Sequence, residues 1–372
     1  MQIYPTDRCH ADTPVDLVFL TMSMGCGGTE RVISRLCNYF VTSHVAIAVV
    51  SIADQGEDFF KLPAEVTRLR LGSVAIELGK WKKMFAYVGL ILRLRTTLRK
   101  LDAHHVASFL PVPNVLLLVA SVGLPVKTIV CERNNPYLQR EMNLVWKIIR
   151  RLCYPLADKI TVNSEAAEEF CRTFRDGTEV IRISNPPMPN IKSAHAMANR
   201  VILYVGRIVH QKGIDILLAA ASQVELLNRG WRLVLVGEGN AKSGLRERCS
   251  ELGLDELIVW KDPTDDIVSE YRNAAFVVLP SRFEGTSNAM LEALAMGLPV
   301  VVSEAGAGGV VVNGFNGIVL QTLSAENLAN ALDRMTSDED LREKLTNNCL
   351  GQSDGASFHQ KMGEWENLFE LS

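Results

Sequence analysis

Two glutamates stand eight positions apart around a run of small and polar residues that suits an anion. The segment follows a short apolar run that predicts a buried strand, and it reads Pro280-Ser-Arg-Phe-Glu284-Gly-Thr-Ser-Asn-Ala-Met-Leu-Glu292. The residues from Gly285 to Asn288 would open a helix, where the first backbone N–H groups lack intrahelical acceptors. Along one helix, Glu284 and Glu292 would lie about two turns, or ~12 Å, apart.

Carboxylates with this separation could hold two well-separated polyols of one long ligand. A sugar nucleotide offers such a pair, a ribose and a sugar, with its diphosphate beside the helix donors. The alternative is an exposed glutamate followed by a capping one, which would explain either residue alone better than it explains the whole string.

A second loop combines glycine with two cations at the expected start of a helix. It follows an apolar run and reads Gly206-Arg207-Ile-Val-His-Gln-Lys212-Gly213. Arg207 and Lys212 stand five residues apart, which suits the spread negative charge of a diphosphate. Two such cations in isolation are more often solvated, but their place after the first strand of a restarting domain favours a phosphate site.

Two weaker signals follow strands in the first half of the chain. Gly27 and Gly28 form a strand-to-helix turn. The turn either binds an anion through its backbone N–H groups or is only a tight turn without a ligand. The turn is not G-x-G-x-x-G, which disfavours a nicotinamide enzyme. Arg133, in Glu132-Arg-Asn-Asn-Pro136, either meets a phosphate or acceptor or pairs with Glu132 at the surface.

Short apolar runs alternate with longer amphipathic segments, the pattern of parallel βα units. In the first half, strands are predicted at Val15–Leu20, Val45–Ser51, Val126–Cys131, Lys159–Val162 and Val180–Ile183. After the proline-rich stretch Ser184–Asn190 the pattern restarts, with strands predicted at 200–206, Trp231–Val236, Leu257–Trp260, Phe276–Leu279, Pro299–Val302 and Gly317–Leu320. The fold class is therefore α/β, with two doubly wound domains whose ligands sit at the carboxyl ends of the strands.

The predicted domains are residues 1–190 and residues 198–352. A final helix, 357–371, is expected to cross back to the first domain because five apolar side chains share one of its faces: Phe358, Met362, Trp365, Leu368 and Phe369.

A cationic helix is predicted in the first domain between Lys80 and Leu101. It holds no acid, and one apolar stripe runs along it at Met84, Tyr87, Ile91, Leu94, Leu98 and Leu101. Lys82, Arg93 and Lys100 fall opposite the stripe. We expect the stripe to pack on the domain's own sheet, while the cations are either solvated or face an anionic membrane. Nucleic acid is disfavoured because the remainder of the chain is acidic.

Composition limits the remaining classes. The 372 residues are 48% hydrophobic and 22% charged, which excludes a disordered or collagen-like chain. Residues 1–190 hold 23 Lys and Arg against 18 Asp and Glu, and the remainder holds 16 against 24, so the halves should meet different partners. Eight scattered cysteines without zinc-ligand spacing suit neutral thiols in a reducing compartment. No signal peptide or membrane-spanning run is found, and we expect a cytoplasmic protein.

Together these loops resemble the retaining glycosyltransferases of family 4, which have the GT-B fold of two facing Rossmann-like domains. The resemblance spans almost the whole chain. Gly27 to Arg31 is similar to the family's G-G-[AT]-E-R start, Gly206 to Gly213 to its G-R…K-G loop, and Glu284 to Glu292 to its E-x7-E signature.

The resemblance implies a role for each matched residue. Arg207 and Lys212 would hold the donor diphosphate, Glu284 would contact the transferred sugar and Glu292 the ribose. The first three would be the catalytic residues, and the rest of the donor site would be Gly28, Val259, Gly285, Thr286, Ser287 and Asn288. In the retaining reaction the departing phosphate oxygen takes the proton of the acceptor hydroxyl, so the resemblance implies no cofactor and no obligatory metal.

The strongest resemblance is to members that extend lipid-linked oligosaccharides at the cytosolic face of the bacterial inner membrane. It implies a UDP-sugar donor carrying an N-acetylhexosamine or hexose, an undecaprenyl-diphosphate-linked acceptor, and a role in O-antigen or similar surface-glycan assembly. Lys82, Arg93 and Lys100 would face the anionic membrane, to which the protein would be peripheral, and Arg133 would face the acceptor.

Three departures from the family pattern leave alternatives open. Arg133 stands where many relatives have His, the usual G-G-x-x-E appears as Gly306-Ala-Gly-Gly309 without the acid, and Val259-Trp-Lys-Asp-Pro263 lacks a common glycine. One alternative is a UDP-sugar epimerase of the same fold, which would convert or hydrolyse the donor without an acceptor. Another is a non-catalytic, nucleotide-sugar-binding membrane scaffold, which would bind the donor without turnover.

Overall fold

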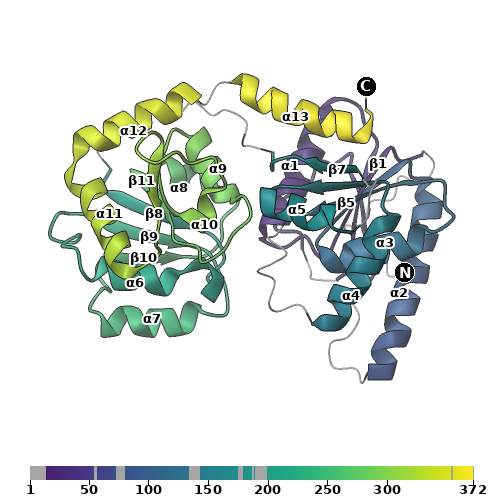
Figure 1. Ribbon diagram of the computed structural model, residues 1–372, viewed down its shortest axis with the longest axis horizontal. Coiled ribbons are helices and arrows are strands. Elements are labelled where there is room, and N and C mark those ends of the chain that lie inside the picture. The colour runs from purple at the N-terminus through teal and green to yellow at the C-terminus, as the bar shows by residue number, and fades with distance from the viewer. Residues whose placement is uncertain are drawn as a thin grey trace. The chain divides into compact units, whose positions relative to one another are not determined.

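The chain folds into two compact units, each a parallel sheet covered by helices (Figure 1). The computed structural model describes residues 14–53, 57–72, 80–133, 143–174, 179–186, 188, 199–352 and 355–371. The first unit comprises Met1–Pro186 together with Met362–Ser372, and the second comprises Pro187–Lys361.

Seven parallel strands form the sheet of the first unit, in the order β3-β2-β1-β4-β5-β6-β7. Their bounds are β1 Leu17–Thr21, β2 Ile47–Ser51, β3 Thr67–Arg70, β4 His105–Phe109, β5 Lys127–Glu132, β6 Lys159–Val162 and β7 Glu179–Arg182. Every residue of β1 and β2 is buried. Helices cover both faces of such a sheet, which is why these two strands are apolar except for their last residues.

Helices of the first unit include the predicted cationic helix. Their bounds are α1 Gly28–Thr42, α2 Lys80–Leu101, α3 Pro111–Ser121, α4 Leu144–Cys153 and α5 Glu165–Arg172. In α2, Leu94, Leu98 and Leu101 are buried in the core, with Tyr87 and Ile91 packed against it. The predicted stripe is thus confirmed from Tyr87 onward, and the side chain of Met84 lies outside the described residues.

The last helix, α13 (Gly355–Phe369), ends on the first unit. The Phe369 ring lies 6.0 Å from that of Phe19 on β1 and 5.7 Å from that of Phe40 on α1. The Lys159 ammonium donates to the Leu368 carbonyl oxygen at 3.3 Å. Buried aromatic rings and a charged donor therefore hold the end of this helix against the first unit.

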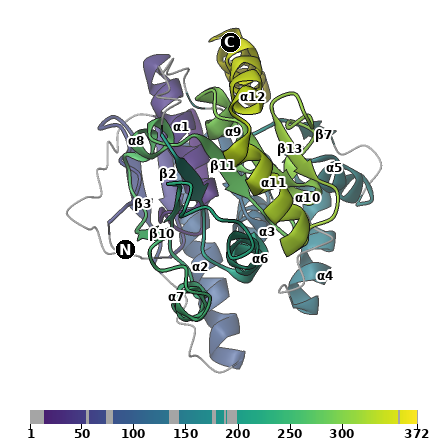
Figure 2. The same cartoon turned by 90° about the vertical axis from the view of Figure 1, so that its left-hand side faces the viewer.

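Six parallel strands form the sheet of the second unit, in the order β10-β9-β8-β11-β12-β13. Their bounds are β8 Val201–Val205, β9 Arg232–Val236, β10 Ile258–Lys261, β11 Phe276–Leu279, β12 Val300–Ser303 and β13 Gly317–Leu320. The helices are α6 Ile214–Ala221, α7 Lys242–Glu251, α8 Ile267–Arg272, α9 Asn288–Ala295, α10 Glu304–Ala307, α11 Ala325–Ser337 and α12 Glu339–Gln352. In Figure 2 this unit is in front, and α6 lies beside α11.

The two doubly wound sheets confirm the predicted fold class, and each predicted strand overlaps an observed one. The structure adds β3 and β4, which were not predicted. Strand β3 reads Thr-Arg-Leu-Arg, and its charged side chains are nevertheless buried because Asp58 pairs with both. The Asp58 carboxylate lies 2.7 Å from Arg68 Nε and 3.2 Å from Arg70 Nη2. Among the described residues, no helix is long and apolar enough to cross a membrane.

Candidate active site

Two predicted site residues meet at the carboxyl edge of the second unit's sheet. Strands β8 and β11 are neighbours there, and the loops that leave them carry Lys212 and Glu284. The Lys212 ammonium donates to Glu284 Oε2, and the Ser281 hydroxyl donates to the same oxygen at 3.1 Å. The two charged side chains are only 13% and 15% exposed, so their attraction is screened less than that of a surface pair.

The two loops are tied together by a glutamine and an arginine. The Gln211 side-chain amide donates to the Phe283 carbonyl oxygen at 2.9 Å, and the Arg282 backbone N–H donates to the Gln211 carbonyl oxygen at 2.8 Å. The Arg282 guanidinium also binds both oxygens of Asp215 at 2.8 and 2.6 Å. These hydrogen bonds from Arg282 lower the pKa of the Asp215 carboxyl. The pairing of Lys212 with Glu284 is thus supported on both sides.

A glycine allows the loops to approach so closely. Gly213 has a φ of +68°, and a Cβ placed on it would lie 2.0 Å from the Pro280 carbonyl oxygen. Both the backbone conformation and the space therefore require glycine at the point where α6 begins. The sequence pattern predicted no such role for Gly213. It missed Gln211, whose partner Phe283 lies 72 residues further along the chain, and it did not single out Ser281 among the polar residues of the loop before Glu284.

Arg207 stays at the surface of the same loop. Its side chain is exposed, and Nη2 lies 3.3 Å from Gln211 Oε1. Beneath it, the Tyr204 hydroxyl donates to the Arg207 carbonyl oxygen at 2.8 Å. Burial, and then the nearby Glu284 carboxylate, holds the pKa of the Tyr204 phenol well above its usual range, so it remains a donor. The loop thus presents one exposed cation beside one enclosed cation.

The start of α9 lies directly after Glu284. Gly285, Thr286 and Ser287 are buried, and the helix begins at Asn288 with Ser287 at its N-cap position. The N-terminal end of a helix carries partial positive charge, which suits the anion that the sequence predicts here.

The structure does not bring the other two predicted donor residues to this point. Glu292 is fully buried, and its carboxylate accepts a hydrogen bond from the Tyr271 hydroxyl at 2.7 Å. Val259 lies in the middle of the edge strand β10, two strands away from β8, and is 39% exposed. The ribose contact of Glu292 and the donor contact of Val259 stay predictions.

In the first unit, Gly28 is the exposed first residue of α1, and Arg133 is buried at the end of β5. The Arg133 guanidinium donates to the Ile183 carbonyl oxygen at 2.8 Å and to Thr161 Oγ1, and it lies 4.8 Å from the centre of the Trp365 ring. Burial lowers the pKa of this guanidinium.

The alternative of a surface pair between Arg133 and Glu132 is wrong. Glu132 points into the core, where it accepts a hydrogen bond from the Tyr154 hydroxyl at 2.9 Å and lies 3.5 Å from Arg150 Nη1. Adjacent residues of a strand point to opposite faces, so the two side chains diverge. The acceptor contact of Arg133 stays a prediction, and Asn134 to Pro136 lie outside the described residues.

The predicted membrane cations lie on α2. Arg93 and Lys100 are exposed, opposite the buried stripe of that helix. The side chain of Lys82 lies outside the described residues.

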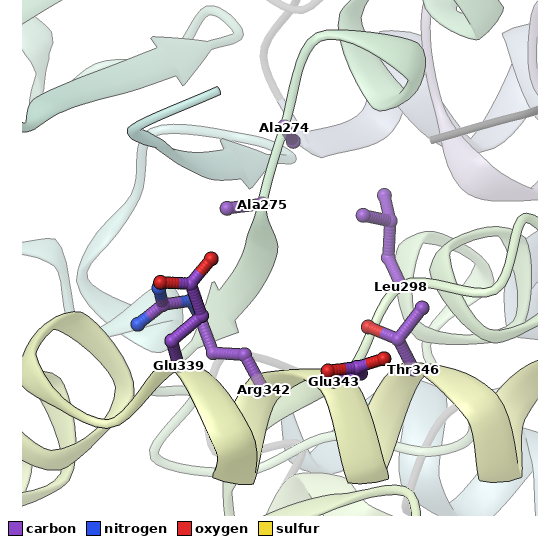
Figure 3. A pocket seen from close by; sticks show the side chains of 7 residues that line it. All are labelled: Ala274, Ala275, Leu298, Glu339, Arg342, Glu343 and Thr346. Atoms are coloured by element: carbon purple, nitrogen blue, oxygen red, sulfur yellow. The ribbon is translucent and has the colours of Figure 1, made fainter. Parts of the chain in front are cut away.

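A small hollow in the second unit lies away from these loops (Figure 3). Ala274 and Ala275 precede β11 and Leu298 precedes β12, so the hollow opens at the amino ends of the strands, beside α12. Ligands of doubly wound sheets bind at the opposite, carboxyl ends. We therefore place the candidate active site at Lys212 and Glu284 rather than at the hollow.

Comparison with known families agrees with this division of the chain. The family model described as Glycosyltransferase Family 4 matches residues 26–186, and that described as Glycosyl transferases group 1 matches residues 190–350. The chain is a glycosyltransferase with a Family 4 domain followed by a group 1 domain. The first model covers the unit with Gly28 and α2, and the second covers the unit with Lys212 and Glu284.

One distant relative matches along nearly its whole length. The glycosyltransferase is 23% identical, over 94% of its length and 97% of the relative's, to a Campylobacter jejuni enzyme named GalNAc-alpha-(1->4)-GalNAc-alpha-(1->3)-diNAcBac-PP-undecaprenol alpha-1,4-N-acetyl-D-galactosaminyltransferase. Sucrose-phosphate synthase from Thermosynechococcus elongatus superposes with a TM-score of 0.81 at 17% identity, covering 96% of this chain and 100% of that one.

A third similar protein, Anabaena HepE in complex with UDP and glucose, superposes with a TM-score of 0.76 at 19% identity, covering 95% and 99%. At these identities the two structures show the fold, which is the GT-B fold expected from the sequence.

Proposed function

We propose that this glycosyltransferase moves a hexose or N-acetylhexosamine from a UDP-sugar to an undecaprenyl-diphosphate-linked saccharide, with retention, during O-antigen or similar surface-glycan assembly. The observation that carries the proposal is the enclosed Lys212–Glu284 pair beside the exposed Arg207, at the carboxyl edge of the second unit's sheet. The relative from Campylobacter jejuni, whose name states an undecaprenol-linked acceptor, supports the acceptor class. The UDP in the HepE structure supports the donor class.

The chemistry assigned to these side chains follows from their charges. A bound diphosphate would compete with Glu284 for the Lys212 ammonium, and Arg207 would reach it from the surface. As the bond between the sugar carbon and the diphosphate breaks, negative charge grows on the leaving oxygen, and the two cations stabilise it there. Released from Lys212, the Glu284 carboxylate can accept hydrogen bonds from hydroxyl groups of the sugar and hold its orientation.

Retention requires the acceptor to approach on the face from which the diphosphate departs. The acceptor hydroxyl oxygen forms the new bond to the sugar carbon, and its proton goes to the departing phosphate oxygen. This route needs no side chain as a base, and we propose that it needs no cofactor and no obligatory metal. The enzyme would work as a peripheral protein on the cytosolic face of the inner membrane, with Arg93 and Lys100 toward the lipid phosphates.

Mass spectrometry of a donor panel tests the proposed function. The protein is incubated with each of several UDP-sugars and an undecaprenyl-diphosphate-linked saccharide, and we expect one donor to add its sugar mass to the acceptor. In the proton NMR spectrum of the product, the coupling constant of the anomeric proton should show the same anomeric configuration as in the donor. Conversion or hydrolysis of the donor without an acceptor would replace the proposal with an epimerase. Donor binding without any product would replace it with a scaffold.

A further inference from the structure

Large apolar side chains are exposed on two helices of the first unit. On α2, Phe85, Val88 and Leu92 are 69%, 50% and 58% exposed. On α4, Leu144, Ile148 and Leu152 are 71%, 51% and 69% exposed. A soluble surface normally scatters such residues singly, so two runs on two helices indicate an interaction surface.

Each run forms a stripe along its helix. Positions 85, 88 and 92 share one face because residues three, four and seven apart are neighbours on a helix. Leu90, Leu94 and Leu98 lie on the opposite face of α2 and are buried in the core. Positions 144, 148 and 152 form a second stripe, and on the other side of α4 the apolar residues Trp146, Ile149 and Cys153 pack against the core. Both helices therefore have two apolar faces, of which the core covers one.

The two stripes belong to one surface. Helix α3 packs against both α2 and α4 on one side of the sheet (Figure 1). The Tyr87 ring, in the N-terminal half of α2, lies at a centroid distance of 5.5 Å from the Trp146 ring in the first turn of α4. Because the inner faces of both helices point toward the unit, the outer stripes both point away from it. We call the six residues of the two stripes the α2–α4 surface.

Charge identifies the kind of partner. Helices α2, α3 and α4 contain no Asp or Glu. The α2–α4 surface is flanked by the exposed cations Arg93, Arg99 and Lys100 on α2 and Lys147 and Arg151 on α4. An apolar centre with a cationic rim fits an anionic lipid bilayer, where the apolar side chains reach the acyl chains and the cations meet phosphates. Two copies of this chain docked through the same surface would bring like charges together.

We propose that α2 and α4 together insert into an anionic membrane through the α2–α4 surface. The inference rests on the proposed function for the lipid-linked acceptor, and it extends it in two ways. It adds α4, and it makes acyl-chain contact, rather than the attraction of Lys82, Arg93 and Lys100 to phosphates alone, the main contribution to attachment. The enzyme would thus be held at the membrane that carries acceptors which cannot leave the bilayer.

Vesicle flotation with exposed-residue variants tests the insertion. The full chain is floated with vesicles of phosphatidylcholine and phosphatidylglycerol, without donor or acceptor. Replacing Leu144 and Leu152 with Ser should weaken the binding about tenfold or more, because two side chains each lose several buried carbons. Both side chains are exposed, so the melting temperature should stay unchanged. Leu350→Ser, at an exposed leucine of α12 in the second unit, should float like the wild type.

Salt separates insertion from charge attraction. In ~1 M NaCl the Debye length is about 3 Å, and we expect the wild type to keep part of its binding while the double variant loses it. Complete release of the wild type by salt, or equal flotation of the wild type and the Leu144→Ser/Leu152→Ser variant, would overturn the proposal. The proposal would also be overturned if the wild type were a dimer and the double substitution made it a monomer without changing its flotation.

Failure of this inference can be told from failure of the proposed function. Affinity for UDP is measured in solution for the wild type and for the double variant, and the two values should agree. Flotation without any UDP binding would leave the insertion standing and remove the donor assignment. UDP binding and sugar transfer without flotation would leave the donor assignment standing and overturn the insertion.

Discussion

Replacing Glu284 with Gln is expected to lower the rate of sugar transfer about a hundredfold to a thousandfold. The substitution keeps the size of the side chain but removes the negative charge that faces Lys212 and Ser281. The amide is a weaker acceptor for sugar hydroxyls, and the Lys212 ammonium loses the partner that positions it. The free energy of unfolding should fall by only about 1–2 kcal/mol, since one charge-assisted hydrogen bond is lost. Initial rates of product formation and urea denaturation measure the two effects.

A matched control removes an ion pair of the same unit at the opposite edge of the sheet. Arg229 Nη1 lies 2.7 Å from Asp333 Oδ1, and Arg229 precedes β9 rather than following a strand. Asp333→Asn should therefore keep the wild-type rate. If Glu284→Gln and Asp333→Asn transferred sugar equally fast, Glu284 would not belong to the reacting site.

Replacing Gly213 with Ala should lower the free energy of unfolding by about 3 kcal/mol. The new Cβ would adopt a φ of +68° and lie 2.0 Å from the Pro280 carbonyl oxygen, so the two loops must separate. Because Lys212 and Glu284 sit on these loops, the transfer rate should fall as well. Urea denaturation and the transfer assay, carried out on the same preparation, give both numbers.

Another glycine of the second unit supplies the control. Gly244 lies inside α7, and a Cβ placed there would meet nothing within 4 Å. Gly244→Ala should raise the free energy of unfolding by about 0.5–1 kcal/mol, because alanine loses less conformational freedom than glycine in a helix. A Gly213→Ala protein as stable and active as Gly244→Ala would show that the close approach at Pro280 is not needed.

The fold could be predicted because most strands contain a short continuous apolar run, as buried parallel strands do. Strand β3 was missed because it reads Thr-Arg-Leu-Arg, and its two arginines are buried with their guanidinium groups paired to the Asp58 carboxylate. That compensation comes from a residue ten or more positions away, outside the strand itself. Hydrophobic periodicity therefore could not find this edge strand.

The candidate site could be predicted in part. Glycines and charges placed directly after strands located Lys212 and Glu284, because the carboxyl ends of β8 and β11 lie side by side. The inward turn of Arg133 could not be predicted, since it depends on Trp365 from the far end of the chain. For α4, apolar residues occur around the helix, and only the observed burial shows which of them are left exposed.

Titration calorimetry with UDP tests most directly whether the carboxyl edge of the second unit binds the donor. We expect the wild type to bind one UDP per chain, and the double variant Arg207→Gln/Lys212→Met to bind it at least about a hundredfold more weakly, because two charge-assisted contacts to the diphosphate are lost. Equal affinity of the wild type and the double variant for UDP would contradict the donor site at Arg207 and Lys212.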